Sequence, residues 1–332
     1  MSGFSEFISA LGRSALLAAG LALAAPVSGA LAQANAPYPS RTITIIAPLA
    51  AGGPTDTTAR VAGEVIAKEL GAQVIVENKP GAGGLLAADY VAKAAPDGYT
   101  LLLYTAGTNL LPVINKNTNI DVVKDFAPIS RLIEAPTAVL INNDLPVKNM
   151  KEFLAYAKAN PGKLNYGVQA ASDALVIAAF NSQMGIDTQP VRYTGGAPVT
   201  QALLSNEVQF SFFFPGTAKS HIDAGKLRLL AVMDDKRFPQ SPDLPTMAEE
   251  GVPSFKFVSY FGLVAPKGTP KAITDRLSAA LAKGMKTGEP AARIKSLGME
   301  VVASTPEEFG KAMDTELARW KAVADKAGIK PE

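Results

Sequence analysis

Residues 43–56 read ITIIAPLAAGGPTD, and this stretch decides the fold. The β-branched run at its start predicts a buried strand over Ile43–Ile46. After the glycines, apolar residues recur at helical spacing up to Leu70, which predicts an amphipathic helix. Strand, glycine turn and helix in this order begin an α/β unit, so we expect an α/β protein.

The turn between this strand and this helix has the properties of an anion-binding site. Gly52 and Gly53 allow a positive φ and let a ligand approach the bare backbone, and Pro54 suits the first helical position. Free amides and the positive end of the helix dipole then attract an anion. No Lys-Ser or Lys-Thr pair follows the glycines, so this is not a phosphate loop. We interpret the turn as one wall of a carboxylate-binding cleft, with simple chain reversal as the alternative.

Asp56 is open to two interpretations. A carboxylate in the first turn of a helix suits the helix dipole, and Arg60 follows at the i+4 position for an ion pair. Both features favour a structural capping role. The functional alternative is that Asp56 binds an amine on the ligand.

Composition excludes several classes of function. The 332 residues are 48% hydrophobic and carry a net charge of +2 with interspersed signs, so the chain is globular and has no basic patch for nucleic acid. It contains no Cys, which excludes disulfides, thiolate metal sites, a lipidated N-terminus and a Cys nucleophile. The one His, His221, is expected to be a solvated helix residue, and no His or carboxylate pair has metal-ligand spacing. We therefore predict no catalytic residue, no metal and no cofactor.

The first 32 residues have the pattern of an export signal. Arg13 precedes an apolar run over Ala15–Ala25, and Ala30-Leu31-Ala32 is a small-residue cleavage site. The run is too short to span a bilayer, so we predict cleavage after Ala32 rather than anchoring. The mature protein, starting near Gln33, is then expected in the periplasm.

The strand–turn–helix pattern occurs in two series, which predicts two α/β domains. The first series runs to about residue 141, and the second restarts at a helix over Asn149–Asn160. The prolines between residues 234 and 253 indicate a surface excursion near a domain crossing. The other expected strands are Gln73–Val76, Tyr99–Tyr104, Pro128–Ile133, Thr137–Ile141, Leu164–Val168, Pro190–Tyr193, Val208–Phe214, Leu227–Met233 and Phe255–Ala265. The other expected helices are Leu85–Ala94, Asp173–Met184, one ending at Ser205, Lys271–Met285, Ala291–Leu297 and Pro306–Ala327, the last with a Thr305/Glu308 capping box and Trp320 packed on its apolar face.

The candidate ligand site follows from this pattern, because ligands of α/β sheets lie beyond the carboxyl ends of the strands. We expect loops 48–56, 81–84 and 105–109 to line one side of a cleft, and loops 169–172, 194–198 and 214–217 to line the other. Phe214 is the aromatic residue that we expect in the cleft, whereas Tyr104, Tyr260 and Phe261 are either core residues or stacking partners of an aromatic acid. The candidate binding residues are Gly52, Gly53, Thr55, Asp56, Gly83, Thr105, Thr108, Gln169, Ala170, Ser172, Thr194, Gly195, Ala197 and Phe214.

Several longer stretches resemble one known family, the periplasmic solute receptors of tripartite tricarboxylate transporters, also called Bug-type receptors. The matching stretches follow the family's order over essentially the whole mature chain. They are AGGPTD at 51–56 with Arg60, VENKPGAGG at 76–84, AKA at 92–94, PDGYTL at 96–101, AKANPGKL at 157–164, YTGGAP at 193–198, GKLR at 225–228 and LPTMAEEG at 244–251.

The resemblance implies a two-domain receptor of the type II periplasmic-binding-protein kind, with a hinge and a ligand cleft. It implies a carboxylate ligand held by main-chain amides and water, with Gly52, Gly53 and Thr55 on the first carboxylate and the loops Gln169–Ser172 and Thr194–Ala197 reaching it from the second domain. Where this chain has Gln169–Leu175, family members often carry a longer Gly- and Ser-rich turn and a His. The far end of the ligand therefore differs from the usual family pattern.

These inferences give one expected organisation and two expected roles. Residues 33–137 plus 256–332 form domain 1, and residues 138–255 form domain 2. We expect a monomer that captures a small carboxylate, most consistently a dicarboxylate, and delivers it to the membrane subunits of a tripartite transporter. The alternative is a sensory receptor for an organic or aromatic acid that acts on a membrane kinase.

Overall fold

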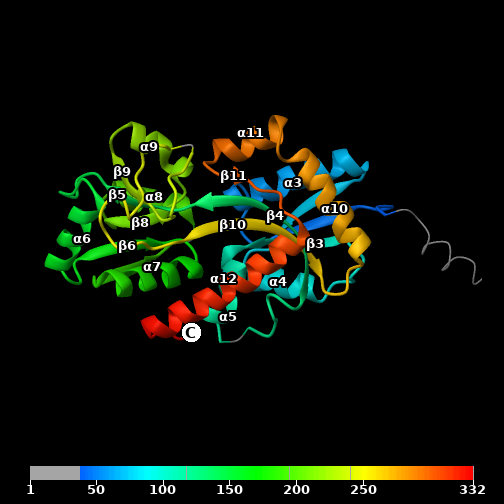
Figure 1. Ribbon diagram of the computed structural model, residues 1–332, viewed down its shortest axis with the longest axis horizontal. Helices are drawn as coiled ribbons and strands as arrows, with labels where there is room; N and C mark the ends of the chain where they lie inside the picture. The colour runs from blue at the N-terminus through cyan, green and yellow to red at the C-terminus, as the bar shows by residue number, and fades with distance from the viewer. Residues whose placement is uncertain (1–37, 117, 194, 240, 332) are drawn as a thin grey trace, which may run out of the picture. The chain divides into compact units, whose positions relative to one another are not determined.

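The computed structural model describes residues 38–331 apart from positions 117, 194 and 240. The predicted export signal, residues 1–32, lies outside the described residues. Residues 41–332 group together as one compact unit, and this unit contains two β-sheets, each with its own helices (Figure 1). In the part of the chain that the structure describes, no helix has the length and apolar character needed to cross a membrane.

The first sheet has six strands and mixed direction. Strands β1, β2 and β3 are parallel to one another, and β10 pairs antiparallel with both β3 and β4. The order is β11-β4-β10-β3-β1-β2. We call this sheet and its helices the first lobe. Its strands are β1 (Ile43–Ala47), β2 (Val74–Asn78), β3 (Thr100–Thr105), β4 (Phe126–Pro136), β10 (Val258–Pro266) and β11 (Glu300–Val301), and its helices are α3 (Pro54–Leu70), η1 (Ala82–Gly84), α4 (Leu85–Ala92), α5 (Ala106–Ile114), α10 (Lys271–Gly284), α11 (Gly288–Ser296) and α12 (Pro306–Ala327).

The second sheet has five strands in the order β7-β6-β8-β5-β9. Strands β6 and β7 are parallel, whereas β5 runs antiparallel to β8 and β9. We call this sheet and its helices the second lobe. Its strands are β5 (Ala138–Asn142), β6 (Leu164–Val168), β7 (Thr188–Arg192), β8 (Phe210–Phe213) and β9 (Leu227–Val232), and its helices are α6 (Met150–Ala159), α7 (Ala171–Met184), α8 (Gly196–Leu204), η2 (Pro215–Ala218) and α9 (Lys219–Asp223).

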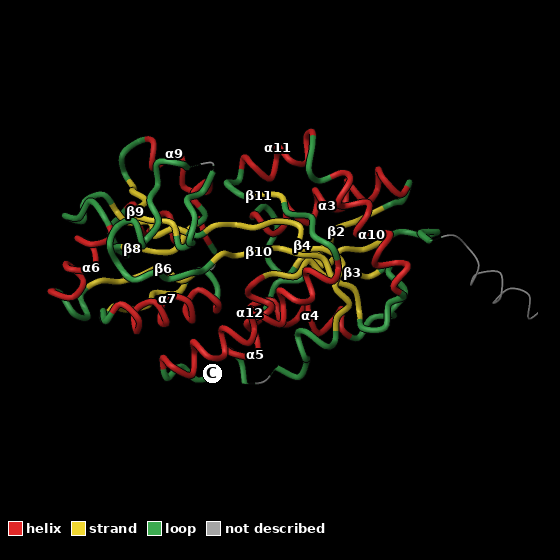
Figure 2. The backbone as a smooth tube through the Cα atoms, viewed as in Figure 1, coloured by secondary structure: helices red, strands yellow, loops and turns green. Residues whose placement is uncertain are grey.

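The chain crosses from one lobe to the other twice, and residues 233–252 of the return segment contain several turns. Thr137 alone separates β4 from β5, and the return segment leads from β9 to the start of β10. The two crossings are tied together, since Met233 N–H donates to Thr137 O at 2.8 Å and Phe257 N–H donates to Met233 O at 2.9 Å. Figure 2 shows β4 and β10 lying side by side where the lobes meet. These crossing segments have the geometry of a hinge.

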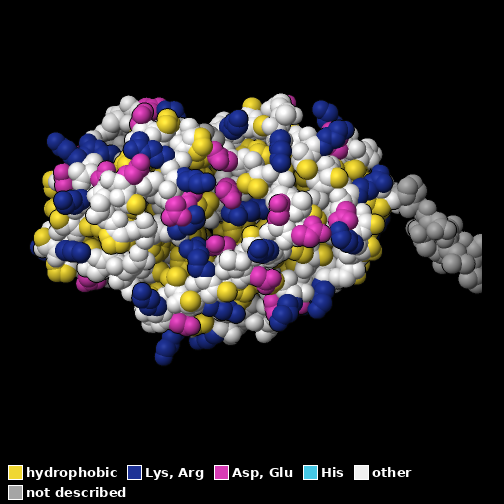
Figure 3. Space-filling view, viewed as in Figure 1, with side chains coloured by type: hydrophobic (Ala, Val, Ile, Leu, Met, Phe, Trp, Pro, Cys, Tyr) yellow, Lys and Arg dark blue, Asp and Glu magenta, His cyan; other side chains and the backbone are white. Residues whose placement is uncertain are grey.

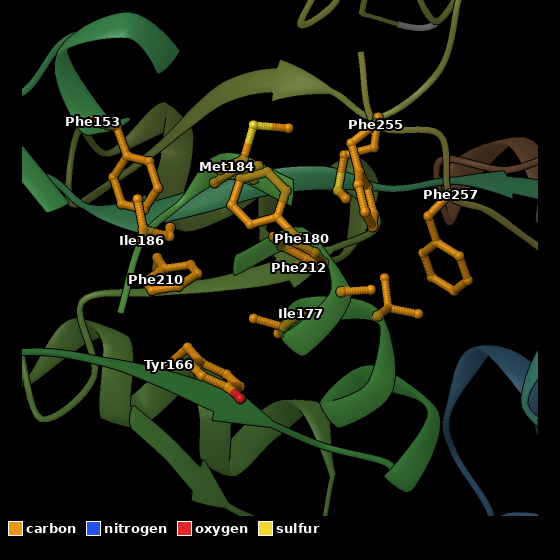
Figure 4. Close-up of a cluster of buried hydrophobic side chains, with 14 of the residues drawn as sticks. Phe153, Tyr166, Ile177, Phe180, Met184, Ile186, Phe210, Phe212, Phe255 and Phe257 are labelled. Carbon is orange, nitrogen blue, oxygen red and sulfur yellow. The ribbon is translucent and has the colours of Figure 1, made fainter. Parts of the chain in front are cut away.

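The core of the second lobe is built from aromatic rings. Phe180 packs edge-on against Phe212 and Phe255, and Phe153 packs against Phe210 (Figure 4). Trp320 of α12, only 2% exposed, packs with Phe255 and Phe257, so the C-terminal helix contributes to this core too. The sequence-based interpretation of Trp320 as a packing residue is therefore confirmed.

Most expected elements are present with shifted ends, and one differs in kind. Helix α12 and its Thr305/Glu308 capping box are as predicted. Residues 105–109, expected as a loop, instead begin helix α5. Thr105 and Thr108 cap this helix reciprocally, because Thr108 N–H donates to Thr105 Oγ1 at 3.0 Å and Thr105 N–H donates to Thr108 Oγ1 at 3.4 Å. The threonine side chains thus supply the hydrogen bonds that start the helix directly at the strand end.

The face of the molecule seen in Figure 3 carries both signs of charge. Figure 3 shows Lys and Arg side chains interspersed with Asp and Glu on the visible face. This distribution agrees with the net charge of +2 and with the interspersed signs in the sequence.

Candidate functional site

A pocket lies where the two lobes and the crossing segments meet. The first lobe contributes the start of α5, the second lobe contributes the start of α7 and the end of β8, and the crossings contribute one wall. Its volume of about 50 Å³ is room for only a few water molecules, at roughly 10–15 Å³ for each. The lining residues are Ala106, Gly107, Thr137, Gln169, Ser172, Asp173, Val176, Phe212, Phe214, Phe257 and Ser259.

Two helices begin at this pocket and direct their amino ends into it. Gly107 in the first turn of α5 and Ser172 in the first turn of α7 are so close that a Cβ added to Gly107 would lie 3.2 Å from Ser172 Oγ. The first amides of a helix have no partner inside the helix, and the helix dipole adds positive potential there. The pocket therefore favours a negatively charged group between α5 and α7.

Thr137 carries the polar group that most directly indicates a ligand. The residue is 2% exposed and lines the pocket. Its Oγ1 atom is buried and has no hydrogen-bond partner among the described residues. A buried hydroxyl without a partner costs folding free energy, about 1–3 kcal/mol, so such atoms call for an explanation. A ligand with a polar group at this position would supply a partner.

One wall of the pocket is aromatic. Phe212 and Phe214 lie on the same face of the chain at β8, with Phe213 on the opposite face in a separate core cluster. Phe214 is half-buried, and its ring stands edge-on to Phe261 of the first lobe at a centroid distance of 6.4 Å. Phe257 adds a third ring. The pocket thus combines an anion-attracting end with an apolar wall.

Asp173 is the one ionisable residue among those that line the pocket. Its Oδ2 atom accepts a hydrogen bond from Ala170 N–H at 3.1 Å. Burial raises the pKa of this carboxyl group to about 7, against the opposing effect of hydrogen bonds from the backbone N–H groups of Gln169 and Ala170. The carboxyl group is therefore partly protonated near neutral pH.

The first-lobe loops predicted to form the site lie together beyond the strand ends. A Cβ added to Gly84 would lie 3.3 Å from Pro48 Cβ and 3.7 Å from Thr108 Oγ1. The turn after β1, the η1 segment containing Gly83 and the start of α5 are thus neighbours. Gly52 and Gly53 face open space, since an added Cβ on either would meet no atom within 4 Å.

Asp56 is engaged in holding the turn after β1. Its carboxylate accepts hydrogen bonds from Gly52 N–H at 3.0 Å, Arg60 Nε at 3.1 Å and Asn78 Nδ2 at 3.1 Å. Burial acts to raise its pKa, but these hydrogen bonds and the Arg60 charge outweigh burial and lower it. The contacts match the capping interpretation, and binding of a ligand amine stays a prediction.

The predicted second-lobe residues fall in three groups. Gln169, Ser172 and Phe214 line the pocket, while Ala170 contributes its N–H to Asp173. The start of α8 is next to Gln169, because a Cβ added to Gly196 would lie 2.9 Å from Gln169 Oε1. The remaining three residues are Gly195, the N-cap of α8, Ala197, which is exposed, and Thr194, which lies outside the described residues.

Sequence reasoning missed the residues of the crossings and of the helix interiors. Phe212 could have been found from Phe214, because residues two apart on a strand share a face. Val176 could have been found from Ser172 by helical spacing. Thr137, Phe257 and Ser259 carry no local signal, since only the meeting of two chain crossings makes them neighbours. Tyr104 and Tyr260, named as possible stacking partners, are core residues at 0% and 1% exposure.

A model of a known protein family matches most of the chain. The family is the "Tripartite tricarboxylate transporter family receptor", and the match covers residues 58–329. The chain belongs to this receptor family. Its members are periplasmic solute-binding receptors, so membership confirms the predicted family, the predicted two-domain binding-protein fold and the prediction that the protein is not an enzyme.

Relatives of this receptor match over nearly their full length. A UPF0065 protein of Cupriavidus necator is 36% identical over 321 residues, which are 96% of this chain and 97% of the relative. Protein BugT of Bordetella pertussis is 31% identical over 316 residues, 93% and 94% of the two chains.

Solved structures of similar receptors share the fold. The periplasmic binding protein BugD is 34% identical with a TM-score of 0.80, covering 89% of this chain and all of BugD. An R. palustris protein solved with adipate is 31% identical with a TM-score of 0.82, covering 89% and 100%. MatC of Rhodopseudomonas palustris, solved with malate, is 33% identical with a TM-score of 0.78, covering 86% and 99%.

Proposed function

We propose that this receptor captures a small dicarboxylate between its lobes in the periplasm and delivers it to a tripartite tricarboxylate-type membrane transporter. The observation that carries the proposal is the pocket between α5 and α7, which combines two helix amino ends with the partnerless hydroxyl group of Thr137. Amides and a hydroxyl group suit a carboxylate, because they donate hydrogen bonds without introducing a full opposing charge.

The size and the relatives support a dicarboxylate as the ligand. The pocket is small, and two similar receptors were solved with adipate and with malate. Both are short acids with a carboxylate at each end. One carboxylate is assigned to the amides of Gly52, Gly53 and Thr55 together with the start of α5, and the other to the second lobe around Gln169 and Ser172.

The proposal extends to how the protein is processed and how its two domains move. The signal peptide is removed after Ala32, and the receptor is a monomer that meets its transporter subunits transiently. Residues 33–137 plus 256–332 move as one body and residues 138–255 as the other, about the crossings at Thr137 and Phe257. Closure on the ligand presents a changed surface to the transporter.

A thermal-shift screen of the mature chain tests the binding function. A ligand that binds only the folded state raises the free energy of unfolding, by about 2.7 kcal/mol when its concentration is a hundred times Kd. The unfolding midpoint rises with it. We expect malate, adipate or a similar dicarboxylate to raise Tm, and sugars, amines and nucleotides to leave it unchanged. Absence of a shift with every carboxylate would contradict the proposal.

A further inference from the structure

The carboxyl group of Asp173 lies in a pocket that we assign to an anionic ligand. Asp173 is the third residue of α7, is half-buried and lines the pocket next to Ser172. One of its oxygens is engaged by Ala170 N–H. A bound carboxylate and an ionised Asp173 in the same small pocket repel each other strongly, so one of the two must be neutralised.

No basic side chain in the described part of the pocket can do this. The other lining residues are all uncharged. Lys256, next to Phe257 in the chain, is engaged by Asp234 and Asp235 at 2.8 and 2.9 Å. A half-buried acid that shares a small pocket with an anion and has no cationic partner there is neutralised by a proton.

The elements packed against α7 contribute no basic side chain to the pocket lining. Helix α5 contains no ionisable residue, and β6 contains only Tyr166, which is buried. Helix α12 shares the core with α7 through Trp320 and Ala324, whereas its Arg319 pairs with Glu316 at 2.7 Å.

We propose that Asp173 binds the ligand in its protonated form, so that capture of a dicarboxylate takes up one proton, which Asp173 donates as a hydrogen bond to a ligand carboxylate. The inference rests on the proposed function and makes Asp173 a specificity-determining residue. The proton comes from solvent and is shared between two carboxyl oxygens, and no covalent bond between heavy atoms forms or breaks.

The proton makes affinity depend on pH in a defined direction. Burial already raises the pKa of the free Asp173 carboxyl group to about 7. Below this pH the proton is in place before the ligand arrives, and Kd stays constant. Above it, each pH unit weakens binding about tenfold, which gives roughly a thirtyfold increase in Kd between pH 6 and pH 8.5.

Isothermal titration calorimetry with adipate and malate tests the proposal. At pH 8, titrations in two buffers of different ionisation enthalpy report the protons taken up, and we expect close to one per ligand. The Asp173→Asn variant keeps a neutral hydrogen-bond donor, so we expect no proton uptake, a constant Kd from pH 6 to pH 8.5, and tighter binding than wild type at pH 8.5. Asp243→Asn, at an exposed site of the second lobe, is the matched control and should behave as wild type.

Three results separate the possible failures. If wild type binds either acid with a constant Kd and without proton uptake, the proposal is wrong while the binding function stands. If Asp173→Asn abolishes binding at every pH and wild type prefers ligands with an amino group, Asp173 is an ionised partner of an ammonium group, and the proposal is again wrong. If no carboxylate binds wild type at any pH, the proposed function itself fails.

Discussion

At the scale of single residues, the hydroxyl group of Thr137 is the feature of the pocket that calls most for a partner. Its hydroxyl group is buried, lines the pocket and has no partner among the described residues. Folding alone gives no reason for this arrangement, because a buried donor without a partner is unfavourable.

Replacing this hydroxyl group should separate stability from binding. We expect Thr137→Val to raise the free energy of unfolding of the unliganded receptor by about 1 kcal/mol, since it removes an unsatisfied polar group. The same variant should bind dicarboxylates at least about tenfold more weakly. Urea unfolding and calorimetry measure the two effects. Unchanged affinity would show that the ligand does not reach Thr137.

Asp173 should impose a pH dependence on stability as well as on binding. Its pKa rises from 3.8 to about 7 on folding, so between these values the folded state holds a proton that the unfolded state has lost. The contribution of Asp173 to the free energy of unfolding is fully present below pH 3.8 and is lost as the pH rises to 7. Three pKa units correspond to about 4 kcal/mol as an upper limit.

The Asp173→Asn variant isolates this contribution. Without ligand, we expect it to be more stable than wild type at pH 8, with the difference shrinking towards pH 4. Urea unfolding at several pH values, compared between the two proteins, gives the difference curve. A difference that does not change with pH would mean that the carboxyl group titrates normally.

At the scale of elements, the turn between β1 and α3 is built to expose its backbone. Two side chains fix the conformation of this turn. Asp56 accepts hydrogen bonds from Gly52 N–H and Asn78 Nδ2, and Asn78 Nδ2 also donates to Leu49 O. Gly53 has an extended backbone with φ −87° and open space at its Cβ position. A side chain there therefore projects towards any ligand on the turn without disturbing the fold.

This gives a direct test of the predicted wall. We expect Gly53→Leu to change the free energy of unfolding by less than about 1 kcal/mol, as at other helix N-caps, and to weaken dicarboxylate binding at least about tenfold. The affinity of the Gly53→Ala variant should lie between that of wild type and that of the leucine variant. Calorimetry on both variants supplies the comparison, and normal binding by the leucine variant would remove this turn from the site.

At the scale of the whole molecule, the lobes touch through two glycines beside the pocket. A Cβ on Gly216 of the second lobe would lie 2.5 Å from Gly298 N of the first lobe, with Leu297 O at 2.6 Å. Backbone atoms offer no flexible side chain that could move aside, so the contact requires glycine. If the lobes close on a ligand as proposed, this contact limits how closely they approach each other.

Gly216→Ala should therefore oppose closure. We expect a receptor of nearly normal stability whose affinity for dicarboxylate falls at least about tenfold, and whose radius of gyration with ligand stays above that of liganded wild type in small-angle X-ray scattering. Ser220→Ala, at a neighbouring exposed position, should leave both values unchanged. An unaltered affinity for Gly216→Ala would place the contact outside the closing motion.

Sequence patterns predicted the parts of this receptor that depend on local chemistry. The β-branched runs, the glycine turns and the capping box at Thr305 indicate strands, turns and helix starts through contacts between near neighbours in the chain. They also indicated loops at the carboxyl ends of the strands, and five residues from these loops line the pocket: Ala106, Gly107, Gln169, Ser172 and Phe214.

What the sequence determined by itself was the α/β class, because strand, turn and helix signals each lie within a few residues, and the receptor family, because several longer stretches resemble it. The tertiary structure alone decided that Thr137, Phe257 and Asp173 share one pocket. They come from two chain crossings and a helix start, and their proximity depends on how the two lobes pack, which no local pattern encodes. The pKa of Asp173 follows from the same packing, since burial exists only in the folded molecule.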